Sequence, residues 1–143
     1  MKVAAVLVSV FAASFFTAGC SNVFGRQRAD EHLTVTQNLV IADVPVPSGY
    51  RIDMSRTYYS SSGGTRVGHL VYTGQSDFPT LLEFFRENMP ISGWTLVKES
   101  SISGSYLLHF EKPSESAVVT VTPGRFQTDL SVDLSPKGGR SVK

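Results

Sequence analysis

The sequence contains little of what a disulfide, a metal site or a familiar catalytic centre requires. Its 143 residues include one cysteine and three histidines, so an intramolecular disulfide is excluded. The zinc-binding spacings CxxC and HxxxH are absent, as are the GxSxG, SxxK and HExxH motifs and a glycine-rich phosphate loop. These absences favour a protein that is not an enzyme and that holds no metal or cofactor.

An excess of charge of either sign is also missing. Thirteen Lys and Arg residues stand against twelve Asp and Glu residues. A chain this close to neutral lacks the positive surface that non-specific nucleic-acid binding needs. We therefore expect no nucleic-acid partner.

The N-terminus carries the clearest signal in the chain. Lys2 precedes an apolar run over Val3–Phe16, which has the length of a signal-peptide core and is short for a membrane span of ~20 residues. The following Thr17-Ala18-Gly19-Cys20 resembles the lipobox of bacterial lipoproteins, which implies removal of residues 1–19 and lipidation of Cys20. A secretory signal with an incidental cysteine and an uncleaved anchor are the alternatives.

Lipidation of Cys20 implies a location. Two acyl chains and a third on the amine hold a protein stably on a bilayer, whereas one chain gives only marginal binding. Ser21 follows the cysteine, and by the sorting rule of enterobacterial lipoproteins this implies the outer membrane, facing the periplasm. The membrane is thus the first expected partner.

The rest of the chain divides into three parts. Residues 20–40 are predicted to be the lipidated N-terminus and a polar tether, residues 41–135 a single domain, and residues 136–143 a disordered tail. Within the domain, Asp43–Tyr50 contains two prolines and is expected to be an extended entry segment outside the central sheet.

One amphipathic helix is predicted. Ser76 and Asp77 are candidate N-caps, Pro79 fits the first turn, and Pro90 is expected to end the helix. The apolar residues recur with helical period and form one face that would lie on a sheet: Phe78, Leu81, Leu82, Phe85 and Met89.

Alternation of apolar and polar residues predicts the strands. They cover 50–54 with a continuation to 59, 65–73, 94–98, 106–111, 117–122 and 128–134, while 60–64 and 100–105 are expected to be a turn and a loop. The order β-β-α-β-β-β-β predicts an α+β two-layer sandwich, in which about five or six mostly antiparallel strands carry the helix on one face.

Candidate chemical groups are few. His32 falls in the tether, and His69 and His109 would meet only if their strands pair; sheet-surface positions are the simpler interpretation. Asp129 and Asp133 share a strand face and would in principle act as acid and base or bind a cation with Asp53 or Glu111, but on an alternating strand such residues are far more often the solvated face. The serines of the two predicted turn segments are interpreted as loop formers.

Three aromatic residues and the basic tail have two interpretations each. Tyr58 and Tyr59 are strand-forming aromatics or mark a binding edge. Trp94 seals the corner between helix and strand or anchors a partner. Lys137, Arg140 and Lys143 form a solvated end or contact anionic lipid.

The stretch Phe78–Phe110, with Pro45–Tyr50 upstream, resembles a family of small uncharacterised bacterial envelope lipoproteins. Its helix followed by a Gly-Trp strand is also similar to the helix-grip domains of a lipoprotein of the outer-membrane β-barrel assembly machinery. The sequence thus predicts a non-enzymatic adaptor or assembly factor that binds an envelope protein. The alternative is a small periplasmic ligand carrier or cell-envelope hydrolase.

Overall fold

The structure, a computed structural model, describes residues 32–137. The predicted signal segment, Cys20 and most of the predicted tail, with Arg140 and Lys143, therefore lie outside the described residues. The elements along the chain are β1 (Arg51–Ile52), β2 (Tyr58–Ser62), β3 (Thr65–Gly74), α1 (Phe78–Ile91), β4 (Thr95–Ile102), β5 (Ser105–Glu111), β6 (Glu115–Pro123) and β7 (Thr128–Pro136). No helix in this part of the chain is both long enough and apolar enough to cross a membrane.

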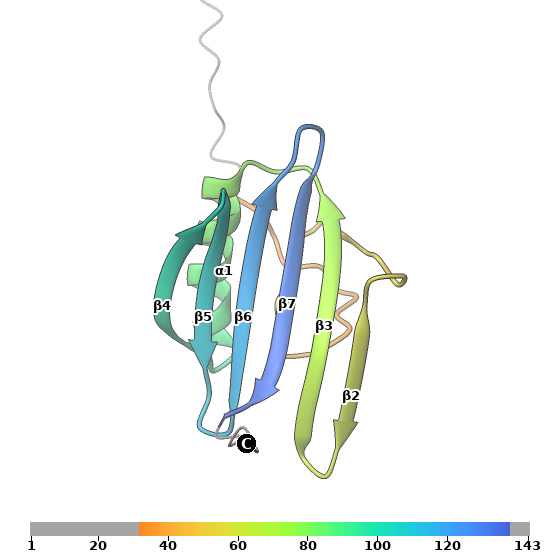
Figure 1. Cartoon of the computed structure of the whole chain (residues 1–143), viewed down its shortest axis with the longest axis vertical. Helices are drawn as coiled ribbons and strands as arrows, with labels where there is room; N and C mark the ends of the chain where they lie inside the picture. Colours follow the sequence, from red (N-terminus) through yellow and green to blue (C-terminus); the bar gives the residue numbers. More distant parts are fainter. Residues whose placement is uncertain (1–31, 138–143) are drawn as a thin grey trace, which may run out of the picture.

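The seven strands form one open antiparallel sheet in the order β1-β3-β7-β6-β5-β4, with β2 beside β3 (Figure 1). After β3 the chain crosses the sheet through α1 and enters β4 at the opposite edge. A meander through β5, β6 and β7 then returns to β3. The predicted α+β class with its single helix is confirmed, and the short β1 brings the strand count above the predicted five or six.

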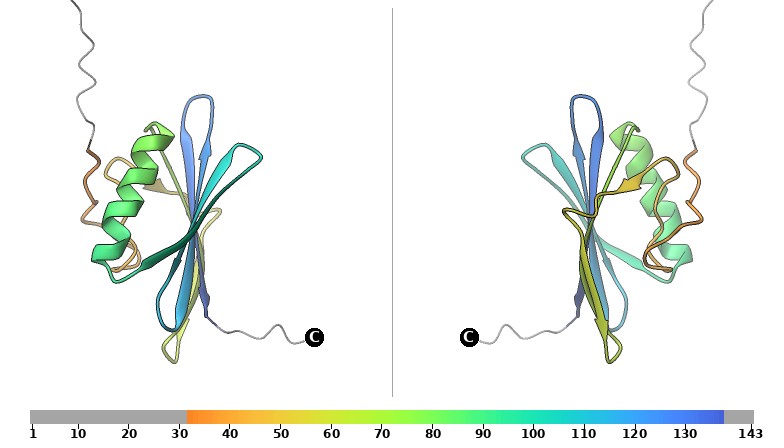
Figure 2. Two further views of the ribbon diagram at one scale, coloured as in Figure 1. Left: turned by 90° about the vertical axis from the view of Figure 1, so that its left-hand side faces the viewer. Right: turned by 90° about the vertical axis from the view of Figure 1, so that its right-hand side faces the viewer.

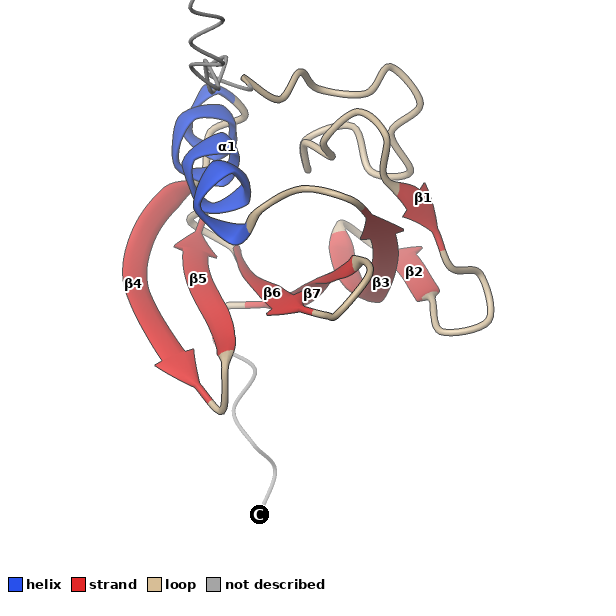
Figure 3. Ribbon diagram, turned by 90° about the horizontal axis from the view of Figure 1, so that it is seen from above, coloured by secondary structure: helices blue, strands red, loops and turns tan. Residues whose placement is uncertain are grey.

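The core lies on one side of the sheet. Figure 2 shows α1 and the segment 32–50 on the same face, and Figure 3 shows the sheet curving around both. The inward side chains of the central strands are almost fully buried, and the bulkiest buried residues come from α1 and its surroundings: Trp94, Phe84, Phe85, Phe110, Leu70, Leu81 and Met89. This burial is the main force that holds the helix on the sheet.

The helix has the predicted apolar face but a different end. Leu81, Leu82, Phe85 and Met89 are buried as expected, and Phe84 joins them. Pro90 does not end the helix, which continues to Ile91. Pro90 stands one residue before the end, so it removes a single helical hydrogen bond, and Ser92 N and Gly93 N close the last turn by donating to the Met89 and Pro90 carbonyls.

Two segments predicted as a turn and a loop belong mostly to strands. Ser60–Ser62 extends β2, and residues 100–102 extend β4. The reversals shrink to two residues each, Gly63-Gly64 and Ser103-Gly104, all four with positive φ. This is the type I′ geometry of tight hairpins. The predicted strand from 50 to 59 is interrupted by a loop over 53–57.

The segment before the sheet is packed against the core rather than free. Val44 and Val46 are 2% exposed, and Thr36 N donates to Val46 O at 2.8 Å. Contacts with the core already begin at Leu33, which lies in the predicted tether. At the other end Pro136, the predicted start of the tail, closes β7.

Candidate functional site

The face of the sheet that points away from α1 is open in the described part of the chain (Figures 2 and 3). Its centre is a row of neighbouring side chains, Val71, Ser131, Thr120 and Leu107, each from the next strand. Val118 lies between Asp133 and His109 in the adjacent row. We call this surface the outer face; it combines half-buried apolar side chains with polar neighbours.

At one side of the outer face, Arg56 binds two carboxylates. Arg56 Nε donates to Asp53 Oδ2 at 2.7 Å, and Nη1 donates to Asp129 Oδ2 at 3.0 Å. The Ser55 hydroxyl and Arg56 hold the pKa of Asp53 at about 2, and the two carboxylates raise the pKa of Arg56. Asp129 and Asp53 are therefore tied to one cation that the protein itself supplies.

A shallow hollow of about 230 Å³ lies beside this arginine, lined by Arg56, His69, Val71, Thr122, Asp129, Leu130 and Ser131. His69 Nδ1 lies 2.6 Å from Asp133 Oδ1, and the Tyr58 ring stacks on the imidazole with 6.0 Å between centroids. Asp129 Oδ1 is buried and has no hydrogen-bond partner among the described residues. The hollow can take a small polar group of a partner.

The same hollow holds an acid, an imidazole and a hydroxyl, which are the parts of a hydrolytic triad. Within the described residues no hydrogen bond joins Ser131 to His69. The surrounding strands are paired on both sides, so their N–H groups serve the sheet ladder and do not form the paired donors of an oxyanion hole.

The other predicted candidates are dispersed. β7 and β6 lie between His69 and His109, which separates their strands by roughly 14 Å. Asp129 and Asp133 do share a face, but Glu111 is remote from them and pairs with Lys137. Within residues 32–137 no group of three His, Cys, Asp or Glu side chains is arranged to hold a metal ion. His32 lies 3.8 Å from Glu87 of α1.

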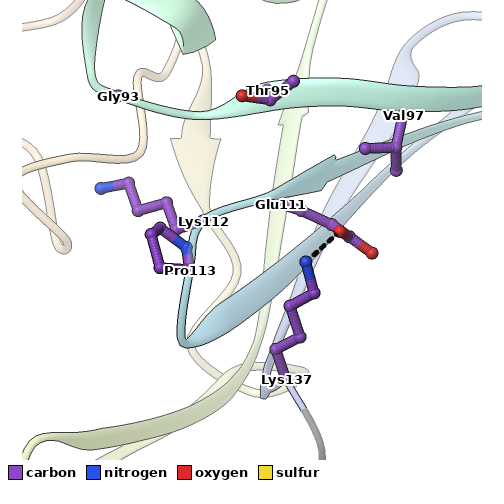
Figure 4. A pocket seen from close by; sticks show the side chains of 7 residues that line it. All are labelled: Gly93, Thr95, Val97, Glu111, Lys112, Pro113 and Lys137. Carbon is purple, nitrogen blue, oxygen red and sulfur yellow. Dashed lines mark hydrogen bonds and ion pairs between the residues drawn. The ribbon is translucent and has the colours of Figure 1, made fainter.

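A second hollow, of about 310 Å³, lies at the start of β4 and beside the β5–β6 turn. Figure 4 shows Lys137 reaching across it to Glu111, while the side chain of Lys112 points elsewhere. Lys112 instead binds Asp43. The opposite charges that line this hollow are already paired, so it offers an incoming ligand little free charge.

The three aromatic residues considered in the sequence analysis lie in different parts of the structure. Trp94 is 2% exposed and closes the corner between α1 and β4, as the core interpretation predicts, and its Nε1 donates to the Asp43 carbonyl at 2.7 Å. Tyr58 and Tyr59 are 61% and 40% exposed on β2. Tyr59 lies on the inner side above Gly68, so only Tyr58 belongs to the outer face.

A cluster of side-chain ion pairs lies on the inner side of the sheet, the side that α1 covers. It was not predicted from the sequence. Arg66 donates to both Asp43 and Glu115, and Lys112 binds the same Asp43 carboxylate. Hydrogen bonds from Arg66 hold the pKa of Asp43 at about 2 and lower that of Glu115. The available signal was Glu115, a charged residue on the inward side of an alternating strand. The cluster fixes the entry segment to the sheet.

The fold and the site define an α+β domain whose single helix fills one face of an open antiparallel sheet and whose other face is accessible. A family model described as START domain-like matches residues 52–138. The match covers more than half of the chain, which therefore belongs to the START domain-like family. Neither a curated protein nor a solved structure matches the chain.

Proposed function

We propose that this chain is a lipid-anchored bacterial envelope protein that binds another envelope protein through the outer face and catalyses no reaction. The observation that carries the proposal is the outer face itself, which has half-buried Val118 and Leu107 among polar and charged side chains. Such a mixture of apolar and polar side chains is typical of non-obligate protein–protein interfaces. START-like domains are generally binding domains, which favours binding over catalysis. Because the family hints at ligand binding, it also fits the alternative of a small ligand carrier.

The N-terminal sequence supplies the anchor in this proposal. Lipid on Cys20 would hold the chain on the outer membrane, facing the periplasm. The described residues begin at His32 beside α1, on the side of the sheet opposite the outer face. An anchor on that side leaves the outer face free for a partner.

The test is site-specific photocrosslinking in cells. A crosslinking amino acid at Val118 samples the outer face, and the same group at Ile91, 82% exposed at the end of α1, is the matched control. We expect a defined envelope protein to be captured from position 118 and not from position 91. Capture from neither position, or the same products from both, would contradict the proposal.

Substitution provides an independent measurement. Val118→Lys places a charge in the centre of the outer face, where Asp133 stands beside it to pair with the lysine. We expect it to abolish co-purification of the captured protein while the circular dichroism spectrum and melting temperature stay close to those of the parent. Ile91→Lys, also apolar to lysine, is expected to retain the partner.

The hydrolase alternative rests on Ser131 and His69, which line one hollow, and on Asp133, which contacts His69. It predicts hydrolysis of a nitrophenyl ester that disappears in Ser131→Ala. The binding proposal predicts no difference between Ser131→Ala and the parent chain in that assay. Ester hydrolysis that depends on Ser131 would contradict the binding proposal and support the hydrolase alternative.

A further inference from the structure

Two hairpin turns at one end of the sheet expose large apolar side chains. The β4–β5 and β6–β7 turns project at the same end of the sheet, the end at which α1 starts (Figures 1 and 2). Ile102 in the first is 59% exposed and Phe126 in the second is 82% exposed. Neither side chain contributes to the core, so folding does not account for apolar residues at these tips.

Both tips are held in defined conformations. Ser103 and Gly104 have φ values of 51° and 82° and make a two-residue turn after Ile102. In the β6–β7 turn, Gly124 N donates to Gln127 O at 3.0 Å. The Arg125 guanidinium lies 5.6 Å from the centroid of the Phe126 ring. A surface that binds these side chains therefore meets them already ordered.

The tips of the two turns carry one charge, and it is positive. The stretches 102–105 and 123–128 contain a single ionisable side chain, Arg125, which takes part in no ion pair described for residues 32–137. The nearest charged residue in sequence is Asp129, which follows the turn and is paired with Arg56; Asp77 precedes α1 at the same end. Exposed apolar side chains beside an arginine are typical of segments that enter the headgroup region of a bilayer with anionic lipids.

We infer that the β4–β5 and β6–β7 turns contact the same bilayer to which Cys20 is anchored. This inference rests on the proposed lipid anchor. Roughly a dozen residues connect Cys20 to His32 and span at most about 40 Å, whereas a ten-residue strand such as β3 is about 33 Å long. The linker is thus long enough for either end of the domain to meet the membrane.

Contact between the two turns and the bilayer determines which end of the domain meets the membrane. Phe126 and Ile102 enter the headgroup region, and Arg125 pairs with lipid phosphates. The strands then lie at a steep angle to the membrane plane. The outer face is turned sideways, away from the lipid, where a neighbouring envelope protein can reach it. Tethering alone would leave the orientation of the domain free.

The experiment uses the full lipidated chain in vesicles of phosphatidylcholine and phosphatidylglycerol, with brominated lipids as quenchers. Phe126→Trp places an indole at the tip. Ile91→Trp places one at the opposite end of α1 on a side chain that is equally exposed, at 82%. Trp94 is 2% exposed and contributes the same background to both variants. We expect a blue shift and quenching for Phe126→Trp only.

Flotation of the vesicles, measured on the same samples, separates the contact from the anchor. A chain that floats but is not quenched at position 126, or is quenched equally at 91, overturns the contact and leaves the anchor intact. A chain that neither floats nor is quenched overturns both. The role of Arg125 is tested by Arg125→Gln, which is expected to weaken quenching in vesicles with phosphatidylglycerol and not in phosphatidylcholine alone.

Discussion

The guanidinium of Arg66 donates hydrogen bonds to both carboxylate oxygens of Asp43, at 2.6 and 2.9 Å. This pair joins the entry segment to β3 across the inner side of the sheet. Lys112 and Trp94 also bind Asp43, through its carboxylate and its carbonyl. One residue thus connects the segment before the sheet to β3, to the start of β4 and to the β5–β6 turn.

We predict that Asp43→Asn lowers the free energy of unfolding at neutral pH by about 2 kcal/mol, because Arg66 and Lys112 lose a partly buried counter-ion. The pKa of Asp43 is about 2 in the folded chain against an ordinary 3.8. A lowered pKa means that the contribution is complete above about pH 4 and is lost as the pH falls towards 2. Urea unfolding followed by Trp94 fluorescence measures both effects.

The control is Asp53→Asn. The pKa of Asp53 is also about 2, but its ion pair with Arg56 is at the surface, where solvent screens it. A smaller loss of stability is expected. If Asp53→Asn costs as much as Asp43→Asn, or if the Asp43→Asn difference persists at pH 2, the inner cluster does not have the role assigned to it.

Local patterns in the sequence are sufficient for much of the fold but not for this cluster. The helix follows from the spacing of Leu81, Phe85 and Met89, and the inner strands follow from their alternation. Asp43 and Lys112 are separated by 69 positions, and no short-range pattern encodes which distant side chains a sheet register brings together. The pairing of β3 with β7, two strands far apart in the sequence, is non-local in the same way.

The polar ends of β2 and β4 show a second limit. Ser60–Ser62 and Ser100–Ser101 were expected in loops because serine is common in turns. Both stretches lie in strands at the edges of the sheet, where one side or both meet water and the side-chain pattern is weak. In the candidate site, the shared face of Asp129 and Asp133 was predictable from their spacing, whereas their partners Arg56 and His69 depend on the register.

A second prediction concerns the contact between Gly74 and Tyr50. A Cβ at position 74 would lie 2.7 Å from three atoms of the Tyr50 ring. Gly74→Ala is therefore expected to destabilise the chain by about 1–3 kcal/mol through overpacking. Tyr50→Ala removes the ring, so the penalty of Gly74→Ala should shrink in the double variant. Urea titrations of all four chains give the coupling energy, and additive effects would show that the ring is not the obstacle.

The β4–β5 turn offers a stabilising change. Ser103 adopts a φ of 51°, in the left-handed region that asparagine tolerates better than serine. Ser103→Asn creates the Asn-Gly pair preferred in type I′ turns and is expected to raise the free energy of unfolding by about 0.5–1 kcal/mol. Ser101→Asn, in the adjoining strand, should give no gain. Equal effects at the two positions would rule out the turn as the cause.

The proposed lipid anchor leads to the prediction with the widest consequences. Mass spectrometry of the mature chain should find Cys20 as an acylated first residue, and Cys20→Ala should move the protein from the membrane to the soluble fraction, because the acyl chains supply the membrane affinity. Ser21→Asp keeps the cysteine and its acylation but alters the sorting position, so it should redistribute the chain to the inner membrane where the enterobacterial rule applies. An intact Met1, or membrane binding that survives Cys20→Ala, would contradict the anchor and return the choice to a cleaved secretory signal or an uncleaved one.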